Sequence, residues 1–87
     1  MKTIWKTEIT AGSGSAALPK GARPISVHVQ DGTPCMWSIV DPEAEIEMRS
    51  IHIAGTGHDL PENLGAFIGT FLVQNDSLVF HVFELNE

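Results

Sequence analysis

The C-terminal third of the chain restricts the fold most, because two apolar runs there flank a short polar segment. The runs are residues 67–73 and residues 78–83, and both are rich in aromatic and β-branched side chains. The polar segment between them, residues 74–77, has the length and composition of a turn. This order predicts an antiparallel hairpin.

Both faces of this hairpin are apolar, because side chains alternate between the two faces of a strand. In the second run, for example, Phe80 falls on one face while His81 and Phe83 fall on the other. A strand with one face in water carries polar residues at every second position. We therefore expect cover on both faces, supplied by a second copy of the chain or by a partner. The expected interface residues are Phe67, Phe71, Phe80, His81 and Phe83.

Length and composition indicate one domain over residues 1–87, with 43% hydrophobic and 18% charged residues. No apolar run approaches the roughly 20 residues that span a bilayer. No stretch near the N-terminus has the order of a signal peptide. The only cysteine, Cys35, cannot form a disulfide within one chain. We therefore expect a cytoplasmic protein.

The net charge of −6 limits the partners, because binding to nucleic-acid phosphates requires clustered Lys and Arg. The basic residues are scattered along the chain, at Lys2, Lys6, Lys20, Arg23 and Arg49. Duplex nucleic acid and anionic membranes are therefore not expected partners. An acidic surface that meets a basic protein, or that mimics phosphates, agrees better with this charge.

The N-terminal half predicts three strands. Residues 2–9 are expected to form an edge strand with Trp5 facing the core, followed by a flexible loop over residues 10–17. Residues 25–30 alternate as a half-buried strand that ends at Asp31-Gly32, a strong hairpin signal. The return strand covers residues 35–40.

The middle of the chain is ambiguous. Residues 45–54 are expected to form a strand with a bulge near Arg49-Ser50, or to follow a short helical turn at residues 42–47. Residues 59–65 are expected to form one helical turn. The predicted fold is all-β, a small antiparallel sandwich or barrel of about six strands with at most one short helical turn.

Residues Gly55, Thr56, Gly57 and His58 form the best candidate ligand site in the sequence. Two glycines allow successive backbone N–H groups to converge on an anion, and His58 adds a hydrogen bond or a charge. Trp37 is the candidate for stacking on a base. The alternative for the loop is a tight connection whose glycines adopt positive φ.

Metal binding and catalysis lack the spacing that either requires. The four histidines do not show zinc-ligand spacing, and no nucleophile has an identifiable base beside it. A row of carboxylates at residues 43, 45 and 47 is expected to be a solvated edge that discourages aggregation. We therefore predict no metal, no cofactor and no enzymatic activity. The histidines are His28, His52, His58 and His81, and the nucleophiles considered are Ser13, Ser15 and Cys35.

Several stretches resemble a family of short uncharacterised phage and prophage proteins. The most distinctive are GTPCMW at residues 32–37, IAGTGH at residues 53–58 and LVFHVFE at residues 78–84. The resemblance extends to residues 1–6, 18–22, 26–30, 40–42 and 68–71. It implies a viral or prophage setting in a host cytoplasm, and it assigns no catalytic residues to positions of this sequence.

Together these features predict a non-catalytic protein that acts stoichiometrically on a host component as a homo-oligomer, with counter-defence as one such role. One alternative is a protein that sequesters a small nucleotide signal at a subunit interface. Another alternative is a virion or assembly component.

Overall fold

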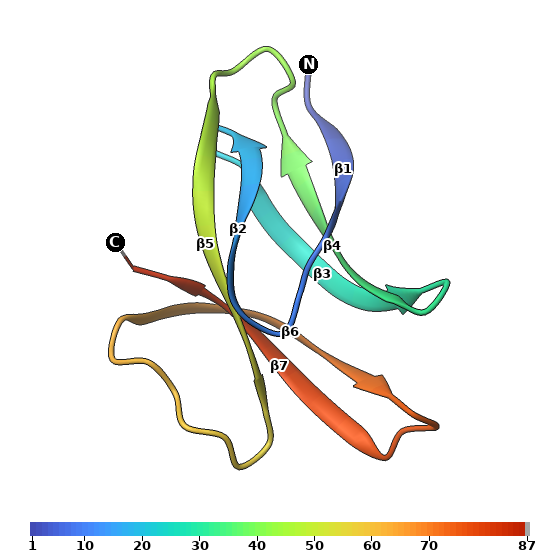
Figure 1. Cartoon of the computed structure of the whole chain (residues 1–87). Coiled ribbons are helices and arrows are strands. Elements are labelled where there is room, and N and C mark those ends of the chain that lie inside the picture. The colour runs from blue at the N-terminus through green and yellow to red at the C-terminus, as the bar shows by residue number, and fades with distance from the viewer. Residues whose placement is uncertain (87) are drawn as a thin grey trace.

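Seven antiparallel strands in two sheets make up the computed structural model, which describes residues 1–86 (Figure 1). One sheet has three strands in the order β1-β4-β3, and the other has four in the order β2-β5-β7-β6. The strands are β1 Thr3–Glu8, β2 Gly12–Pro19, β3 Arg23–Gln30, β4 Thr33–Val40, β5 Ile46–Gly55, β6 Leu64–Val73 and β7 Leu78–Leu85. The two sheets do not close into a barrel, so the all-β prediction is confirmed in its sandwich form. No helix that could cross a membrane occurs in residues 1–86.

Both predicted hairpins form. Strands β3 and β4 are joined by Asp31 and Gly32, whose φ angles are 51° and 80°. Two successive positive φ angles match the right-handed twist of paired strands, and Asp-Gly adopts them readily. Strands β6 and β7 pair antiparallel as predicted, from Leu64 opposite Leu85 to Val73 opposite Leu78.

The core lies between the sheets and is made of aliphatic side chains and Phe71. From the three-stranded sheet, Val27, Met36 and Val40 point inward, and Trp5 packs against them from the edge strand β1 as predicted. From the four-stranded sheet, the core receives Ala16, Leu18, Ile51, Ile53, Phe71 and Val82.

The flexible loop predicted over residues 10–17 is wrong, because most of this segment belongs to strand β2. Its Gly, Ser and Ala residues have low β propensity, and pairing with β5 overrides that preference. The pairing is regular from Gly12 opposite Ile53 to Pro19 opposite Ile46. Within it, Ala16 and Leu18 are buried while Ser15 and Ala17 are exposed, the alternation of a half-buried strand.

Two smaller predictions also fail. Strand β5 passes Arg49 and Ser50 without a break in its pairing with β2, so no bulge is present there. Instead, Ile46 and Met48 face solvent while Ile51 and Ile53 face the core, which accounts for the change of parity. The helical turns predicted for residues 42–47 and 59–65 do not form, because these residues are irregular connections up to the points where strands β5 and β6 begin, at Ile46 and Leu64.

The two sheets approach each other closely where β3 meets β6. Gly69 allows this approach, because a Cβ atom placed on it would lie 2.8 Å from Cγ2 of Val27. This contact holds the C-terminal hairpin against the three-stranded sheet. One face of the hairpin is therefore covered within a single chain.

Candidate functional site

The other face of the hairpin belongs to a surface that we call the outer face of the four-stranded sheet. The pairing register places its residues in rows that run across the strands. They lie on the side opposite Val82, Phe71 and Ile53, which point into the core. One row is Ser13, His52, Phe83 and Phe67, the next holds His81 and Thr70, and a third holds Val79 and Leu72.

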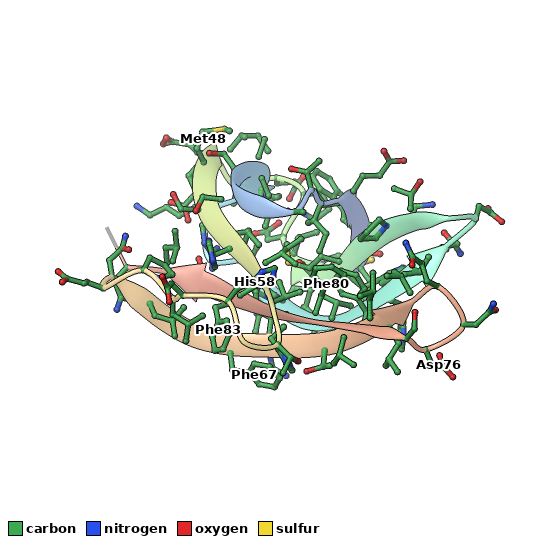
Figure 2. The ribbon with its side chains drawn as sticks, turned by 60° about the horizontal axis from the view of Figure 1, so that its bottom comes forward. Met48, His58, Phe67, Asp76, Phe80 and Phe83 are labelled. Atoms are coloured by element: carbon green, nitrogen blue, oxygen red, sulfur yellow. The ribbon has the colours of Figure 1, made fainter. Side chains whose placement is uncertain are left out.

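Large apolar side chains on the outer face are open to solvent. Phe67 is 59% exposed and Leu72 is 45% exposed. Phe67 and Phe83 contact each other edge to face, with ring centroids 5.4 Å apart. Figure 2 shows Phe67 on the opposite side of the β7 ribbon from Phe80.

Of the five predicted interface residues, three lie on the outer face, namely Phe67, His81 and Phe83. Phe71 does not, since it is only 4% exposed and belongs to the core. Phe80 stacks on Phe71 at 5.6 Å and packs against the same core. The prediction that Phe71 and Phe80 are interface residues is therefore wrong. One face of the hairpin packs on the core of its own chain, and only the other face is open.

Polar groups on the outer face pair with one another. His81 Nε2 lies 2.9 Å from Thr56 Oγ1, and its Nδ1 lies 3.2 Å from Thr70 Oγ1. Ser13 Oγ lies 2.8 Å from His52 Nδ1, across the β2–β5 pairing. These imidazole–hydroxyl pairs satisfy polar groups within the surface, which lowers the cost of covering it. Sequence reasoning did not associate Ser13 with His52, because it assigned Ser13 to a loop.

Charge distinguishes the outer faces of the two sheets. On the three-stranded sheet, the residues opposite the core-facing positions include Lys6, Glu8 and Arg23. On the four-stranded sheet, the rows defined above contain no Lys, Arg, Asp or Glu within the described part of the chain. The chain thus combines a net charge of −6 with one largely apolar face whose described rows are uncharged.

The predicted glycine loop forms one wall of an open pocket of about 470 Å³. The loop is a tight turn in which the His58 N–H donates to the Gly55 carbonyl at 3.0 Å, and Gly57 has a φ of 90°. The opposite wall comes from the start of β7, and the full lining is Gly55, Thr56, His58, Ser77, Leu78, Val79 and Phe80.

Trp37 is not part of this pocket. It lies on β4 in the three-stranded sheet, between Lys6 and Ser26, and its ring is 6.0 Å from that of His28. The structure therefore brings Gly55, Thr56 and His58 together with β7 residues, and it leaves Trp37 on another sheet. The sequence contained no signal for this separation, because strand order decides it.

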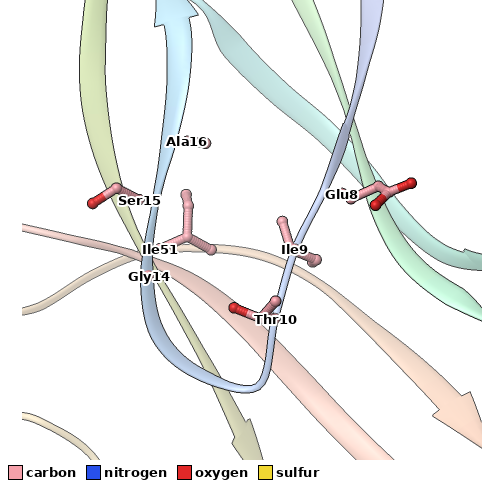
Figure 3. A pocket seen from close by; sticks show the side chains of 7 residues that line it. All are labelled: Glu8, Ile9, Thr10, Gly14, Ser15, Ala16 and Ile51. Carbon is pink, nitrogen blue, oxygen red and sulfur yellow. The ribbon is translucent and has the colours of Figure 1, made fainter.

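A second, smaller hollow lies between the β1–β2 connection and strands β2 and β5 (Figure 3). Ile9, Thr10, Ser15 and Ile51 contribute to its lining. Its volume of about 120 Å³ is below the roughly 300 Å³ of small-molecule pockets, so it matches ordered water better than a ligand. No group of three or more potential metal-ligating side chains gathers anywhere in residues 1–86.

Comparison with known proteins gives one match. The family model described as "Domain of unknown function (DUF7352)" matches residues 1–87. No curated protein and no solved structure matches the chain.

Proposed function

Because the chain belongs to this family of unknown function, we propose a function from its own surfaces: it is a non-catalytic binding protein that works as a homo-oligomer. The observation that supports this proposal is the outer face of the four-stranded sheet. There, Phe67 and Leu72 are largely exposed beside Phe83, on a surface whose described residues carry no charged side chain.

An exposed apolar sheet face of this kind is typical of an interaction surface. At about 25 cal/mol per Å² of apolar surface, fully covering one phenylalanine or leucine side chain stabilises an assembly by about 2–3 kcal/mol. The aromatic pair of Phe67 and Phe83 provides the kind of anchor that dominates binding energy at interfaces.

A second copy of the chain is the occupant that the charge favours. A strongly basic partner would select an acidic surface, and the outer face has no carboxylate among its described residues. Two copies that each carry −6 repel each other least when they meet through an uncharged face. Because a two-fold axis joins the same patch to itself, Phe67 of each copy would add to the same interface.

The setting forms part of the proposal. The sequence stretches that resemble phage and prophage proteins support action in a host cytoplasm. There the protein would bind a host component stoichiometrically, and counter-defence is one role of this kind. The hydroxyl–imidazole pairs are consistent with a binding surface, because each joins side chains of paired strands on an open sheet face.

Light scattering coupled to size-exclusion chromatography tests the assembly. We expect a mass at a small multiple of 9.4 kDa for the native chain, and a single-chain mass after Phe67→Ser. The matched control is Ile4→Ser, because Ile4 is 55% exposed and lies on the other sheet. This control variant should retain the native mass.

A native mass of 9.4 kDa at millimolar concentration would contradict the proposal. Open-ended species of increasing mass would instead favour the alternative of an assembly component, because heterologous contacts whose rotation does not close build filaments.

A further inference from the structure

The pocket beside the glycine loop has a feature that the proposed assembly does not use: a histidine ring that accepts a hydrogen bond from the backbone. The Gly55 N–H donates to His58 Nδ1 at 3.2 Å, and the ring lies directly over Gly55. A Cβ atom on Gly55 would approach Cε1 of this ring to 2.8 Å, so only glycine permits the arrangement. In the neutral ring Nδ1 then accepts, and Nε2 carries the hydrogen as a donor.

The pocket also offers a hydrogen-bond acceptor. Ser77 Oγ donates its hydrogen to the Gln74 carbonyl at 2.7 Å, which leaves the oxygen lone pairs of Ser77 to accept. The lining therefore combines one donor, at His58 Nε2, with one acceptor, at Ser77 Oγ.

An apolar wall completes the pocket. Phe80 stacks on Phe71 at 5.6 Å with an interplanar angle of 23°, and Phe71 is fixed in the core. Leu78, on the same face of β7 as Phe80, extends this wall. Figure 2 shows His58 and Phe80 close together on the same side of the β7 ribbon. A flat ring placed there would lie against a preorganised surface.

The charges near the pocket oppose an anionic ligand. No Lys or Arg is among the described residues that line it. Asp59 follows His58 in the chain and Asp76 precedes Ser77, so both walls continue into an acidic residue. A phosphate group would meet no compensating cation there.

We infer that this pocket binds a small uncharged heteroaromatic molecule, of the nucleobase or nucleoside class, without a phosphate group. A nucleobase edge carries neighbouring donors and acceptors, which complement His58 Nε2 and Ser77 Oγ. Its flat face matches the wall formed by Phe80 and Leu78. The volume of about 470 Å³ lies within the range of small-molecule sites.

The test is a titration of the ¹⁵N- and ¹³C-labelled protein with adenosine up to about 5 mM, followed by NMR. We expect saturable shifts confined to Gly55, Thr56, His58, Ser77 and Phe80, with a dissociation constant on the order of 10⁻⁴ M for a ligand of this size. Adenosine 5′-monophosphate should bind at least about tenfold more weakly, because its phosphate finds no cation.

Two variants and one control sharpen the test. His58→Phe retains a ring but removes the donor, and Ser77→Ala removes the acceptor, so each should weaken adenosine binding by about fivefold or more. His28→Phe makes the same change on the three-stranded sheet and should leave the binding unchanged.

Three outcomes would overturn the inference: no saturable shift with adenosine, shifts scattered over both sheets, or equal binding of the monophosphate. The assembly is tested separately, since Phe67→Ser changes a side chain on the other side of β7 from Phe80 (Figure 2). Adenosine binding should therefore be retained in that variant.

Discussion

Arg49 on β5 and Glu84 on β7 form a two-point ion pair at the inner margin of the four-stranded sheet. Arg49 Nη2 donates to Glu84 Oε1 at 2.9 Å, and Arg49 Nε donates to the other carboxylate oxygen. Arg49 Nη1 also donates to the Ala22 carbonyl at 3.0 Å, at the start of the segment that leads into β3. One guanidinium thus connects two neighbouring strands to the connection between the sheets.

Replacing Arg49 with methionine should lower the free energy of unfolding by about 2 kcal/mol, because it leaves a half-buried carboxylate and the Ala22 carbonyl without their donor. Urea denaturation measures this change. Arg23→Met, on the exposed side of β3, is the control and should change stability by less than about 0.5 kcal/mol.

The stability that this ion pair contributes should not change at alkaline pH. The hydrogen bonds that Arg49 donates to Glu84 raise the pKa of Arg49 above its usual range, against the opposing effect of burial. A raised pKa in the folded state gives a contribution that is fully present below the unfolded pKa and is lost only above it. The stability difference between the native chain and Arg49→Met should therefore stay constant from about pH 6 to pH 10. A steady decline over this interval would contradict the assignment.

Gly69→Ala should destabilise the fold by about 1–3 kcal/mol, because the added methyl group would lie 2.8 Å from Val27 Cγ2. In a double-mutant cycle with Val27→Ala, the loss of stability in the double variant should be smaller than the sum of the two single losses by about 1 kcal/mol. Gly14→Ala is the matched control, because its Cβ would meet only Thr10 Oγ1 at 3.5 Å. Strict additivity would show that the approach of β3 to β6 does not depend on Gly69.

Gln74→Gly should stabilise the protein by about 0.5 kcal/mol, which is about 3 °C in melting temperature. Gln74, Asn75 and Asp76 have successive positive φ angles of 52°, 56° and 68°, and a left-handed conformation is costly for a side chain such as that of glutamine. Gln30→Gly in extended strand β3 should instead destabilise, since it adds entropy to the unfolded chain and removes the acceptor of the hydrogen bond from Lys6 Nζ. A lower melting temperature for Gln74→Gly would contradict the prediction.

Cys35 should be almost unreactive in the folded protein. Its side chain is buried, and its thiol lies 3.4 Å from the Thr33 carbonyl that accepts from it. Labelling with a disulfide reagent should be at least about 100-fold slower than in urea, because only the opened chain exposes the thiol. The assembly mass should also be unchanged by reducing agents. A disulfide-linked dimer on a non-reducing gel would contradict this expectation.

The alternation of apolar and polar residues identified most strands, because a strand buries one face and the residues that occupy this face must be apolar. The turn at Asp31-Gly32 and the inward position of Trp5 followed from local signals, and both are confirmed. Strand β2 was missed because pairing with β5, rather than the propensity of Gly, Ser and Ala, decides its conformation. The helical turn expected at residues 59–65 failed because one turn has too little cooperativity to persist without packing.

The sequence predicted which residues belong to the candidate sites better than it predicted which of them lie together. The alternation of His81 and Phe83 with Phe80 indicated two apolar faces, but only the sheet order shows which face the core covers. The pairing of Ser13 with His52 joins residues 39 positions apart, which no local pattern records. Trp37 and the glycine loop were grouped by residue type, and the strand order separates them.

The place of β7 in the four-stranded sheet has a consequence for synthesis on the ribosome. This strand lies between β5 and β6, although it is translated after both of them. Until it emerges, β6 has no partner in its own sheet, and the second half of β5 lacks a neighbour on that side. The nascent polypeptide must therefore keep these apolar segments from aggregating until β7 has left the ribosome, a delay during which chaperones can bind it.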